Sequence, residues 1–456
     1  MVLSNSSLRE TIAKNSDTYL QWLTDACSIP SMAGEPDGLS AMAAWLEERF
    51  EDLGAPVERL QVESGPPALL AELGSGNRTL LIYDHYDVQP VDPIELWDSP
   101  PFEPAIRDGV FYARGAADNK GDLVARLAGL DAYKQVHGDL PVAVKFLVEG
   151  EEESGSKSFE RIVSRFRHML EADGCVWEGL GIDYGGRPEF VFGVKGLAYV
   201  ELNYIGLADD QHSSVAVIAP SPVWHMVEAL ATLRDSSGRV LIDGFYDDVV
   251  PPSDDDLRML KELPFDEKAE LERLGVDAFV GEATGEELKR RYYFEPTCNI
   301  AGIVAGYNVP GASKTVLPRQ VMAKLDMRLV PEQDPDDVVA KLRKHLDDRG
   351  FGDIDITTLS MEHPVRCPQD SLVARATIEA ARKVFSEPPA LSPMMIGTGP
   401  MHAIAASLGV PTVSPGGVCR PYSNIHAPNE NCRIDDFLEV VEYTAAYVDS
   451  FATLDG

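Results

Sequence analysis

The chain has 456 residues, more than one hydrophobic core usually supports, so about two domains are expected. Its 40 basic and 74 acidic residues give a formal charge of −34, which disfavours nucleic acid and anionic membranes as partners. No segment approaches the roughly 18 consecutive apolar residues that a membrane helix needs. Six widely spaced cysteines predict free thiols, so we expect a cytoplasmic protein.

The first part of the chain has the pattern of an α/β domain. Residues 7–27 and 38–53 are predicted helices, the second because its apolar residues recur at helical spacing. From about 56 to 193, apolar strands alternate with helical stretches, including one from Asp118 to a terminating glycine, Gly138. This alternation favours a mostly parallel sheet with helices on both faces.

The pattern changes near residue 194. Strands and helices then follow in the order β-α-β-β-α-β, which predicts a ferredoxin-like α+β domain. A proline-rich acidic excursion at 236–293, with a helix-like stretch near 265–290, is predicted to be an insertion of unknown function. The predicted domains are 1–193, the first part of an α/β domain, 194–368, inserted into it, and 369–456, its second part.

Potential metal ligands follow strand-like runs at five places in the chain. They are His85 with Asp87, Asp118, the run Glu151–Glu153, Glu178, and His426. An α/β sheet presents its chemistry outside the carboxyl ends of its strands, so these side chains are expected to converge. Imidazole and carboxylate groups suit a hydrolytic metal site.

Each of these signals is weak when it is taken alone. A histidine near an acid, such as His85, is more often not a ligand, and a run of three glutamates is commonly a solvated loop. Here the run directly follows an apolar strand, so a general base beside a metal ligand is an equally good interpretation. No role is predicted for the remaining histidines outside these segments: His137, His168, His225, His345, His363 and His402.

Three longer motifs carry a more specific signal. They are WDSPPFEPAIRDGVFYARGAADNKGD, EGEEESGS and KTVLPRQVMAKLDMRLVP. With the segments above, they make the chain resemble the aminoacylase, carnosinase and glutamate-carboxypeptidase family of di-zinc exopeptidases, and most closely its carnosinase-like cytosolic non-specific dipeptidase branch. The similarity covers nearly the whole chain.

The resemblance implies two divalent metal ions per subunit, zinc or alternatively manganese or cobalt. Asp118 would bridge the two ions, and the peptide bond after it would be cis. Asp87 would orient His85, and Glu152 would be the base that takes a proton from the attacking water. The implied metal ligands are His85, Asp118, Glu153, Glu178 and His426.

The inserted domain would supply substrate contacts and form a homodimer. His212 resembles a lid histidine that reaches the active site of the partner subunit, although Ser214 stands where the family has glycine. Arg328 matches an arginine that binds the substrate carboxylate, and Thr315 and Thr398 fall at substrate-contact positions.

The predicted enzyme is a metallopeptidase, dipeptidase-like or carboxypeptidase-like, that cleaves the amide bond of dipeptides or similar small substrates with a free C-terminal carboxylate. An N-acyl-amino-acid deacylase with the same metal chemistry is the first alternative. A non-catalytic peptide-binding protein on a hydrolase scaffold is the distant one, because such proteins usually lose a ligand or the base.

Overall fold

The computed structural model describes residues 5–62, 65–311 and 313–455, which form two compact units. Unit 1 runs up to Gly193 and also contains Arg366–Pro393 and the chain from Pro400 onward. Unit 2 contains Val194–Val365 together with the short segment Met394–Gly399. The strands β10 (Gly193–Val194) and β17 (Val365–Arg366) span two of the points where the chain passes between the units.

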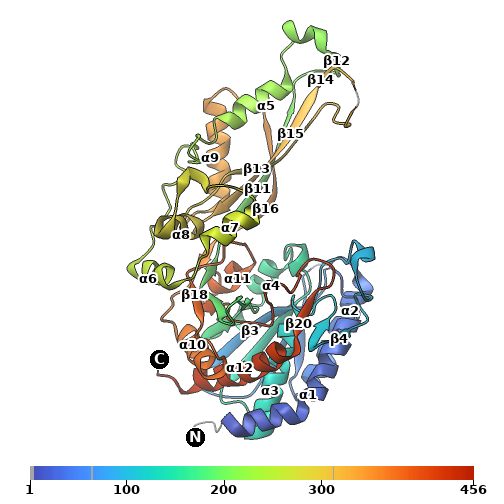
Figure 1. Cartoon of the computed structure of the whole chain (residues 1–456), viewed down its shortest axis with the longest axis vertical. Coiled ribbons are helices and arrows are strands. Elements are labelled where there is room, and N and C mark those ends of the chain that lie inside the picture. Colours follow the sequence, from blue (N-terminus) through green and yellow to red (C-terminus); the bar gives the residue numbers. More distant parts are fainter. Residues whose placement is uncertain (1–4, 63–64, 312, 456) are drawn as a thin grey trace. The chain divides into compact units, whose positions relative to one another are not determined.

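A six-stranded sheet forms the centre of unit 1 (Figure 1). The neighbouring strands from β6 through β3 and β7 to β19 pair in parallel, while β1 and β2 add an antiparallel edge. All residues of β3 after Thr79 are buried, which accounts for the unbroken apolar run Leu80–Tyr83 in this strand. In spatial order the strands are β1 (Val57–Leu60), β2 (Ala68–Leu73), β6 (Ala143–Glu149), β3 (Thr79–His85), β7 (Gly174–Val176) and β19 (Thr412–Val413).

Helices cover this sheet, as predicted. The long helix α3 lies against α1 and α12, and α10 lies against α12. Gly138 ends α3 with φ 86°, a conformation that glycine adopts at little cost. The helices of unit 1 are α1 (Asn5–Ser28), α2 (Pro36–Asp52), α3 (Lys120–His137), α4 (Phe159–Arg165), α10 (Leu372–Val384), α11 (Met401–Ala405) and α12 (Ile434–Thr453).

Short elements complete unit 1. Two further small sheets consist of β4 (Ala105–Arg107), β5 (Val110–Tyr112) and β20 (Asn431–Arg433), and of β8 (Gly181–Ile182), β9 (Pro188–Val191) and β18 (Ala390–Ser392). Single 3-10 turns are η1 (Ile94–Leu96), η2 (Glu152–Ser154) and η3 (Arg167–Met169).

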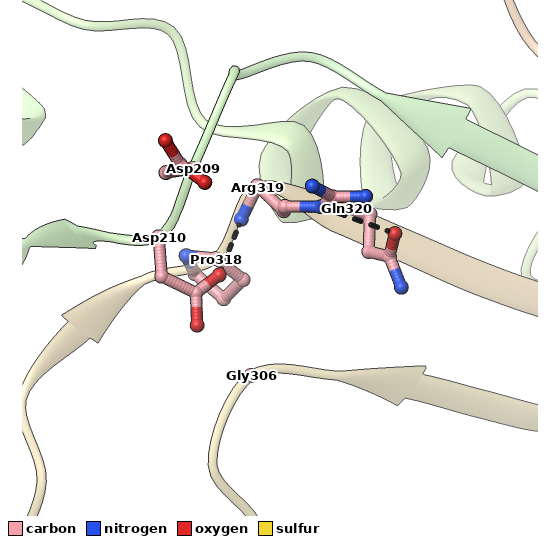
Figure 2. A pocket seen from close by; sticks show the side chains of 6 residues that line it. All are labelled: Asp209, Asp210, Gly306, Pro318, Arg319 and Gln320. Carbon is pink, nitrogen blue, oxygen red and sulfur yellow. Dashed lines mark hydrogen bonds between the residues drawn. The ribbon is translucent and has the colours of Figure 1, made fainter.

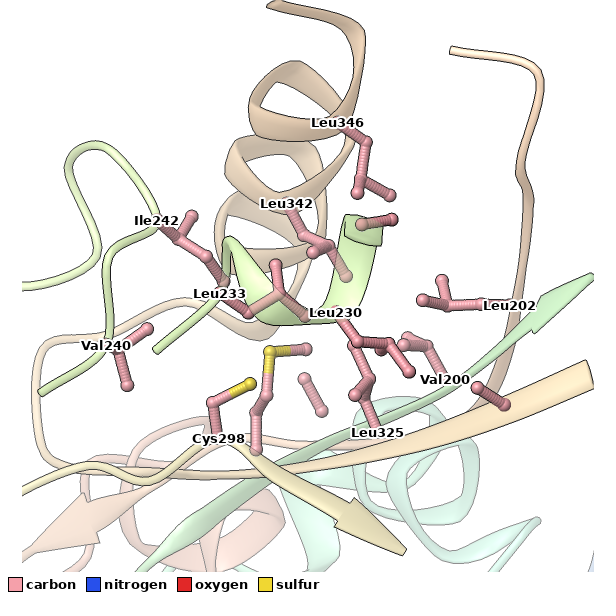
Figure 3. Packing of buried hydrophobic residues seen from close by; sticks show 14 of the residues in the cluster. Val200, Leu202, Leu230, Leu233, Val240, Ile242, Cys298, Leu325, Leu342 and Leu346 are labelled. Carbon is pink, nitrogen blue, oxygen red and sulfur yellow. The ribbon is translucent and has the colours of Figure 1, made fainter. Parts of the chain in front are cut away.

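Unit 2 has the predicted β-α-β-β-α-β order. Its antiparallel sheet has the spatial order β13-β15-β11-β16, as in a ferredoxin-like fold. Buried leucines from the two helices, such as Leu230 and Leu342, pack on Val200 and Leu325 of the sheet (Figure 3). The elements are β11 (Gly196–Ile205), α5 (Pro222–Ala231), β13 (Asn299–Ala305), β15 (Gln320–Leu329), α9 (Pro335–Asp348) and β16 (Asp355–Glu362).

The acidic insertion holds three short helices, and the helix-like stretch predicted near 265–290 is divided between the last two of them. Gly275 and Gly281, both at φ 67°, interrupt it in the left-handed region. Ser253 begins the first helix with a capping box that it forms with Asp256. The helices are α6 (Asp254–Glu262), α7 (Glu267–Leu274) and α8 (Gly285–Phe294), with the turn η5 (Val280–Glu282) between the last two.

Unit 2 also carries a small ribbon of β12 (Gln211–His212) and β14 (Val316–Leu317), followed by the turn η4 (Ser213–Val217). None of the helices within the described residues is long and apolar enough to cross a membrane.

Candidate metal centre and substrate contacts

The predicted ligands of unit 1 lie at the carboxyl ends of parallel strands. His85 is the last residue of β3 and stands in register with Glu149 at the end of β6. Glu178 comes two residues after the end of β7, and Glu152 and Glu153 follow β6 in the turn η2. Because β6, β3 and β7 are parallel neighbours, their ends share one edge of the sheet.

Asp118 is central to the group. It lies just before α3, and its peptide bond to Asn119 is cis, as the resemblance implied. One carboxylate oxygen lies 3.1 Å from Nε2 of His85, and the other lies 3.0 Å from Nε2 of His426. Each oxygen of Asp118 therefore faces a different imidazole.

Two further carboxylates complete the two halves of the group. Glu178 Oε2 lies 3.4 Å from Nε2 of His85, and Glu153 Oε2 lies 3.3 Å from Nε2 of His426. Ligand atoms of Asp118, Glu153 and His426 all lie within 4.8 Å of one another. The structure thus brings all five predicted ligands together, with Asp118 between two pairs.

The electrostatics of the group fit a bound cation. Burial and the Glu178 carboxylate raise the pKa of Glu152 well above its usual value, and burial raises the pKa of Glu178 to about 7. Hydrogen bonds to Asp118 and Glu153 raise the pKa of His426 to about 10. Closely spaced carboxylates outnumber the imidazoles here, so positive charge is needed to keep them ionised.

An orphaned atom supports the same interpretation. Glu153 Oε1 is buried and has no hydrogen-bond partner among the described residues. A buried carboxylate oxygen without a partner is costly unless a cation coordinates it. Imidazole nitrogen and carboxylate oxygen are donors that zinc, manganese and cobalt all accept, so the residues present fit divalent ions of this class.

Asp87 contacts both His85 and the backbone of the turn η2. Its carboxylate lies 3.4 Å from Nδ1 of His85, and it also accepts the backbone N–H groups of Glu152 and Glu153 at 3.2 and 3.0 Å. A carboxylate behind a ligating imidazole fixes the ring orientation and raises its basicity. Asp87 therefore links the end of β3 to the turn that carries Glu152.

Two supporting residues escaped the sequence analysis. The buried carboxylate of Glu430 accepts the backbone N–H groups of Gly115, Ala117 and Asp118 at 2.9–3.0 Å and pairs with Arg114 at 2.6 Å. Gln89 donates to Glu153 Oε2 at 2.8 Å. Their only sequence signal is proximity to predicted ligands, since Glu430 ends the segment HAPNE that begins with His426.

In unit 2, the structure brings Arg328 and Thr398 together. Nη1 of Arg328 donates to Oγ1 of Thr398 at 2.7 Å, and Nε lies 3.3 Å from Asp326. Arg328 stands at the end of β15, and Thr398 belongs to the short segment Met394–Gly399. These contacts orient the guanidinium while leaving other N–H groups for a ligand.

His212 and Thr315 lie elsewhere in unit 2, His212 on the small ribbon and Thr315 directly before its second strand. His212 pairs with Val316, the residue after Thr315, and both predicted residues are exposed. The backbone N–H of Ser214 donates to Nδ1 of His212 at 3.2 Å, which leaves the ring proton on Nε2. Although serine stands here in place of the family's glycine, the backbone N–H of Ser214 favours the His212 tautomer in which Nε2–H is the donor.

A polar pocket lies beside this ribbon, lined by Asp209, Asp210, Gly306, Pro318, Arg319 and Gln320 (Figure 2). Asp210 accepts the backbone N–H of Arg319 at 3.0 Å, which ties the residues before His212 to the start of β15. None of the predicted site residues lines the pocket.

Comparisons with known proteins place this chain among peptidases. The profile of peptidase family M20/M25/M40 matches residues 81–450. The human Beta-Ala-His dipeptidase is 30% identical over 406 residues, which cover 82% of this chain and 78% of that protein. The Cys-Gly metallodipeptidase dug1 of Schizosaccharomyces pombe is 28% identical and covers 76% of each chain.

Among solved structures, the M20 family metallo-carboxypeptidase Sso-CP2 from Sulfolobus solfataricus is 39% identical, with a TM-score of 0.89 over 96% of this chain and 99% of its own. Human carnosine dipeptidase 1 is 28% identical, with a TM-score of 0.77 over 99% and 100% of the two chains.

Proposed function

The chain belongs to peptidase family M20/M25/M40, and from this premise we propose that it is a metallopeptidase that cleaves dipeptides with a free C-terminal carboxylate. The observation that carries the proposal is the position of Asp118 between His85 with Glu178 and Glu153 with His426. The relatives named above are peptidases, and none is a deacylase or a non-catalytic binding protein.

The five clustered residues would hold two divalent ions, with Asp118 shared between them. His85 and Glu178 would bind one ion, and Glu153 and His426 the other. When bound, such ions polarise a carbonyl and make water acidic enough to react near neutral pH. We propose zinc as the physiological metal, because its preferred donors are those present here.

Glu152 is proposed as the general base. Its backbone N–H is held by Asp87, so its side chain starts from a fixed point in the turn η2. Burial among carboxylates raises its pKa, which favours proton uptake from an attacking water. Glu152 then returns this proton to the leaving amine, and Nε2–H of His212 donates to the oxyanion.

Arg328 is proposed to bind the substrate carboxylate. A planar guanidinium can make two parallel hydrogen bonds to a carboxylate, and Thr398 and Asp326 fix its orientation. This recognition favours dipeptides over substrates whose C-terminus is blocked.

The six free thiols support a cytoplasmic enzyme.

A substrate screen tests the function. The metal-free enzyme should be inactive, and zinc should restore hydrolysis of dipeptides but much less of the corresponding dipeptide amides. N-acyl amino acids serve as the comparison substrates. If they react faster than dipeptides, the enzyme is a deacylase, and activity that survives complete metal removal would contradict the metal-dependent mechanism.

The positions of His212 and Thr315 support a homodimer. They lie near the start of the ten-residue strand β15, and Arg328 lies at its far end. At about 3.3 Å per residue, these ends are about 30 Å apart, whereas a dipeptide spans about 7 Å. One dipeptide cannot contact both ends of the same unit, so His212 and Thr315 are proposed to serve the active site of the partner.

Unit 2 offers an apolar surface for this association. The edge strand β13 exposes Ile300, Ile303 and Val304, and α5 exposes Trp224 and Val227. An exposed edge strand with apolar side chains favours pairing with another chain.

Mixing two inactive variants tests whether the site is shared. In a mixed dimer of His212→Ala and Glu152→Gln chains, one site has both residues intact and the other has neither. Random exchange makes about half the dimers mixed, so activity should approach about a quarter of the wild-type rate. If subunits exchange and no activity returns, His212 does not act across the dimer.

A further inference from the structure

A buried lysine lies where three segments of unit 2 meet. Lys195 directly precedes β11 and is 3% exposed. Its ammonium donates to the backbone carbonyls of Tyr292 and Glu295 at 2.9 and 2.8 Å, at the end of α8. The last carbonyls of a helix lack partners within the helix and attract positive charge. Lys195 therefore holds the end of the acidic insertion.

The residues that follow α8 are hydrogen-bonded to the backbone of Arg328. Thr297, two residues after Glu295, donates its backbone N–H to the carbonyl of Arg328 at 2.9 Å. Its hydroxyl oxygen accepts the backbone N–H of Arg328 at 3.2 Å. Fixing the end of α8 thus fixes the backbone around Arg328.

A second connection runs from the backbone of Lys195 to Thr398. The N–H of Lys195 donates to the carbonyls of Met395 and Gly397 at 3.2 and 3.0 Å. Thr398, the next residue, accepts the guanidinium of Arg328 at 2.7 Å and donates to the carbonyl of Gly196 at 3.4 Å. Both connections from Lys195 therefore end at Arg328.

The insertion also packs on the segment that carries Thr398. Leu260 of α6, Phe294 of α8 and Met394 form a buried apolar cluster. Lys289 joins the two helices, because its ammonium donates to the carbonyls of Leu260 and Leu263 at 2.7 and 2.6 Å. Helices α6 and α8 thus support Met394–Gly399 from one side.

We propose that Lys195 is a positioning residue for Arg328 and Thr398, and that the acidic insertion acts through it to shape the site that binds the substrate carboxylate. The inference rests on the proposed function of Arg328. It assigns a role to helices α6 and α8, which contain none of the predicted site residues. Lys195 itself acts through its neighbours and is not assigned contact with the substrate.

The test compares Lys195→Met with Lys289→Met. Both substitutions remove an ammonium that donates to two carbonyls near a helix end. Hydrogen bonds lead from Lys195 to Arg328 and Thr398, whereas Lys289 reaches the Thr398 segment only through the packing of α6 and α8. The measurement is KM and kcat for a dipeptide and for its C-terminal amide. Lys195→Met should raise KM for the dipeptide about 10-fold, the low end of the effect of one charged hydrogen bond. KM for the amide and the metal content should stay near their wild-type values.

Lys289→Met should change the preference for the free carboxylate much less than Lys195→Met, because it acts on the Thr398 segment only through the packing of α6 and α8. Equal loss of preference in both variants would reduce Lys195 to a general structural role and overturn the proposal. Met394→Ala is the second variant, because it keeps Lys195 and loosens the packing of α6 and α8 on the Thr398 segment. It should shift the same preference in the same direction, and an unchanged preference in both Lys195→Met and Met394→Ala would also overturn the proposal.

Arg328→Met separates this inference from the function on which it rests. If Arg328→Met keeps the preference for the free carboxylate, the proposed role of Arg328 fails. If Arg328→Met abolishes the preference while folded Lys195→Met retains it, only the positioning role of Lys195 fails.

Discussion

The candidate metal centre and the substrate contacts are built differently. In unit 1, the side chain of His85 is 1% exposed, and buried carboxylates such as Asp87 and Glu430 hold the backbone on either side of the ligands. In unit 2, His212 and Thr315 are exposed, and Ser214 is the hydrogen-bond partner of His212. Buried carboxylates thus support the ligands of unit 1, whereas His212 and Thr315 of unit 2 lie at accessible positions.

The largest expected effect is that of the proposed base. Glu152→Gln should lower kcat by about 10²–10⁴-fold while two metals stay bound, because the base acts on water and is not a ligand. Steady-state kinetics and metal analysis measure the two quantities. Glu151→Gln is the matched control. The Glu151 carboxylate accepts the backbone N–H of Ser158, so this substitution should leave kcat near the wild-type value.

Metal loss in Glu152→Gln would make Glu152 a ligand and move the base to a neighbour. A strong fall in kcat for Glu151→Gln with normal turnover in Glu152→Gln would mean that the roles within the triplet are shifted by one residue.

The shared position of Asp118 gives a second test. Asp118→Ala should lower the occupancy of both metal ions, and His426→Ala that of one ion, because only Asp118 faces both imidazoles. Metal stoichiometry after dialysis against a weak chelator distinguishes the two patterns. Two ions retained at wild-type affinity in either variant would contradict the ligand assignment.

The support given by Glu430 should be measurable in metal affinity. In Glu430→Gln an amide group would face backbone N–H donors, so the loop that carries Asp118 would lose part of its anchor. A loss of 10–100-fold in metal affinity is expected, as for other residues that orient ligands. Chelator competition measures the affinity, and thermal unfolding of the metal-free protein measures stability.

Asp436→Asn is the control for Glu430→Gln. Asp436 is also a buried carboxylate paired with an arginine, Arg420, at 2.5 and 2.8 Å. Its loss should lower stability while metal affinity is kept. Equal losses of metal affinity in the two variants would mean that Glu430 has no specific effect on Asp118.

Sequence patterns predicted most of the framework because they are local. Helical spacing identified α2. The apolar strand runs identified the segments whose polar residues the structure brings together at one edge of a sheet. The division of roles within Glu151–Glu153 came from resemblance, because spacing alone does not distinguish three adjacent carboxylates.

Other features depend on contacts between distant residues. Glu430 accepts the backbone N–H of Asp118, which lies 312 positions away in the sequence. Every residue type except proline has this N–H group, so no sequence pattern indicates such a contact. The segment Met394–Gly399 belongs to unit 2 through its packing, although residues on both sides of it belong to unit 1. The helix-like stretch predicted near 265–290 is divided in the structure, because Gly275 ends α7 in the left-handed conformation.

The smallest expected effect concerns unit 2 alone and tests whether it responds to pH independently of the metal centre. His345 in α9 is buried, and burial, with Arg349 nearby, lowers its pKa. The Thr232 hydroxyl donates to the carbonyl of Ala229, so Nε2 of His345 donates to that hydroxyl oxygen at 2.9 Å. Nδ1 is then unprotonated, and it is buried without a hydrogen-bond partner among the described residues.

Because the folded pKa of His345 lies below the unfolded value of 6.5, the unfolded chain binds more protons as the pH falls. The stabilisation is complete above this value and is lost as the pH falls through the folded pKa. One proton changes the free energy of unfolding by at most about 1.4 kcal/mol per pH unit.

His345→Gln, which keeps a donor for Thr232, should flatten the pH dependence of unfolding between pH 7.5 and 5, whereas His168→Gln, at an exposed position, should not. Metal affinity at pH 7.5 should be unchanged in both variants, because His345 lies in unit 2 and the ligands lie in unit 1. An unaltered slope in His345→Gln would mean that this histidine is not the source of acid sensitivity.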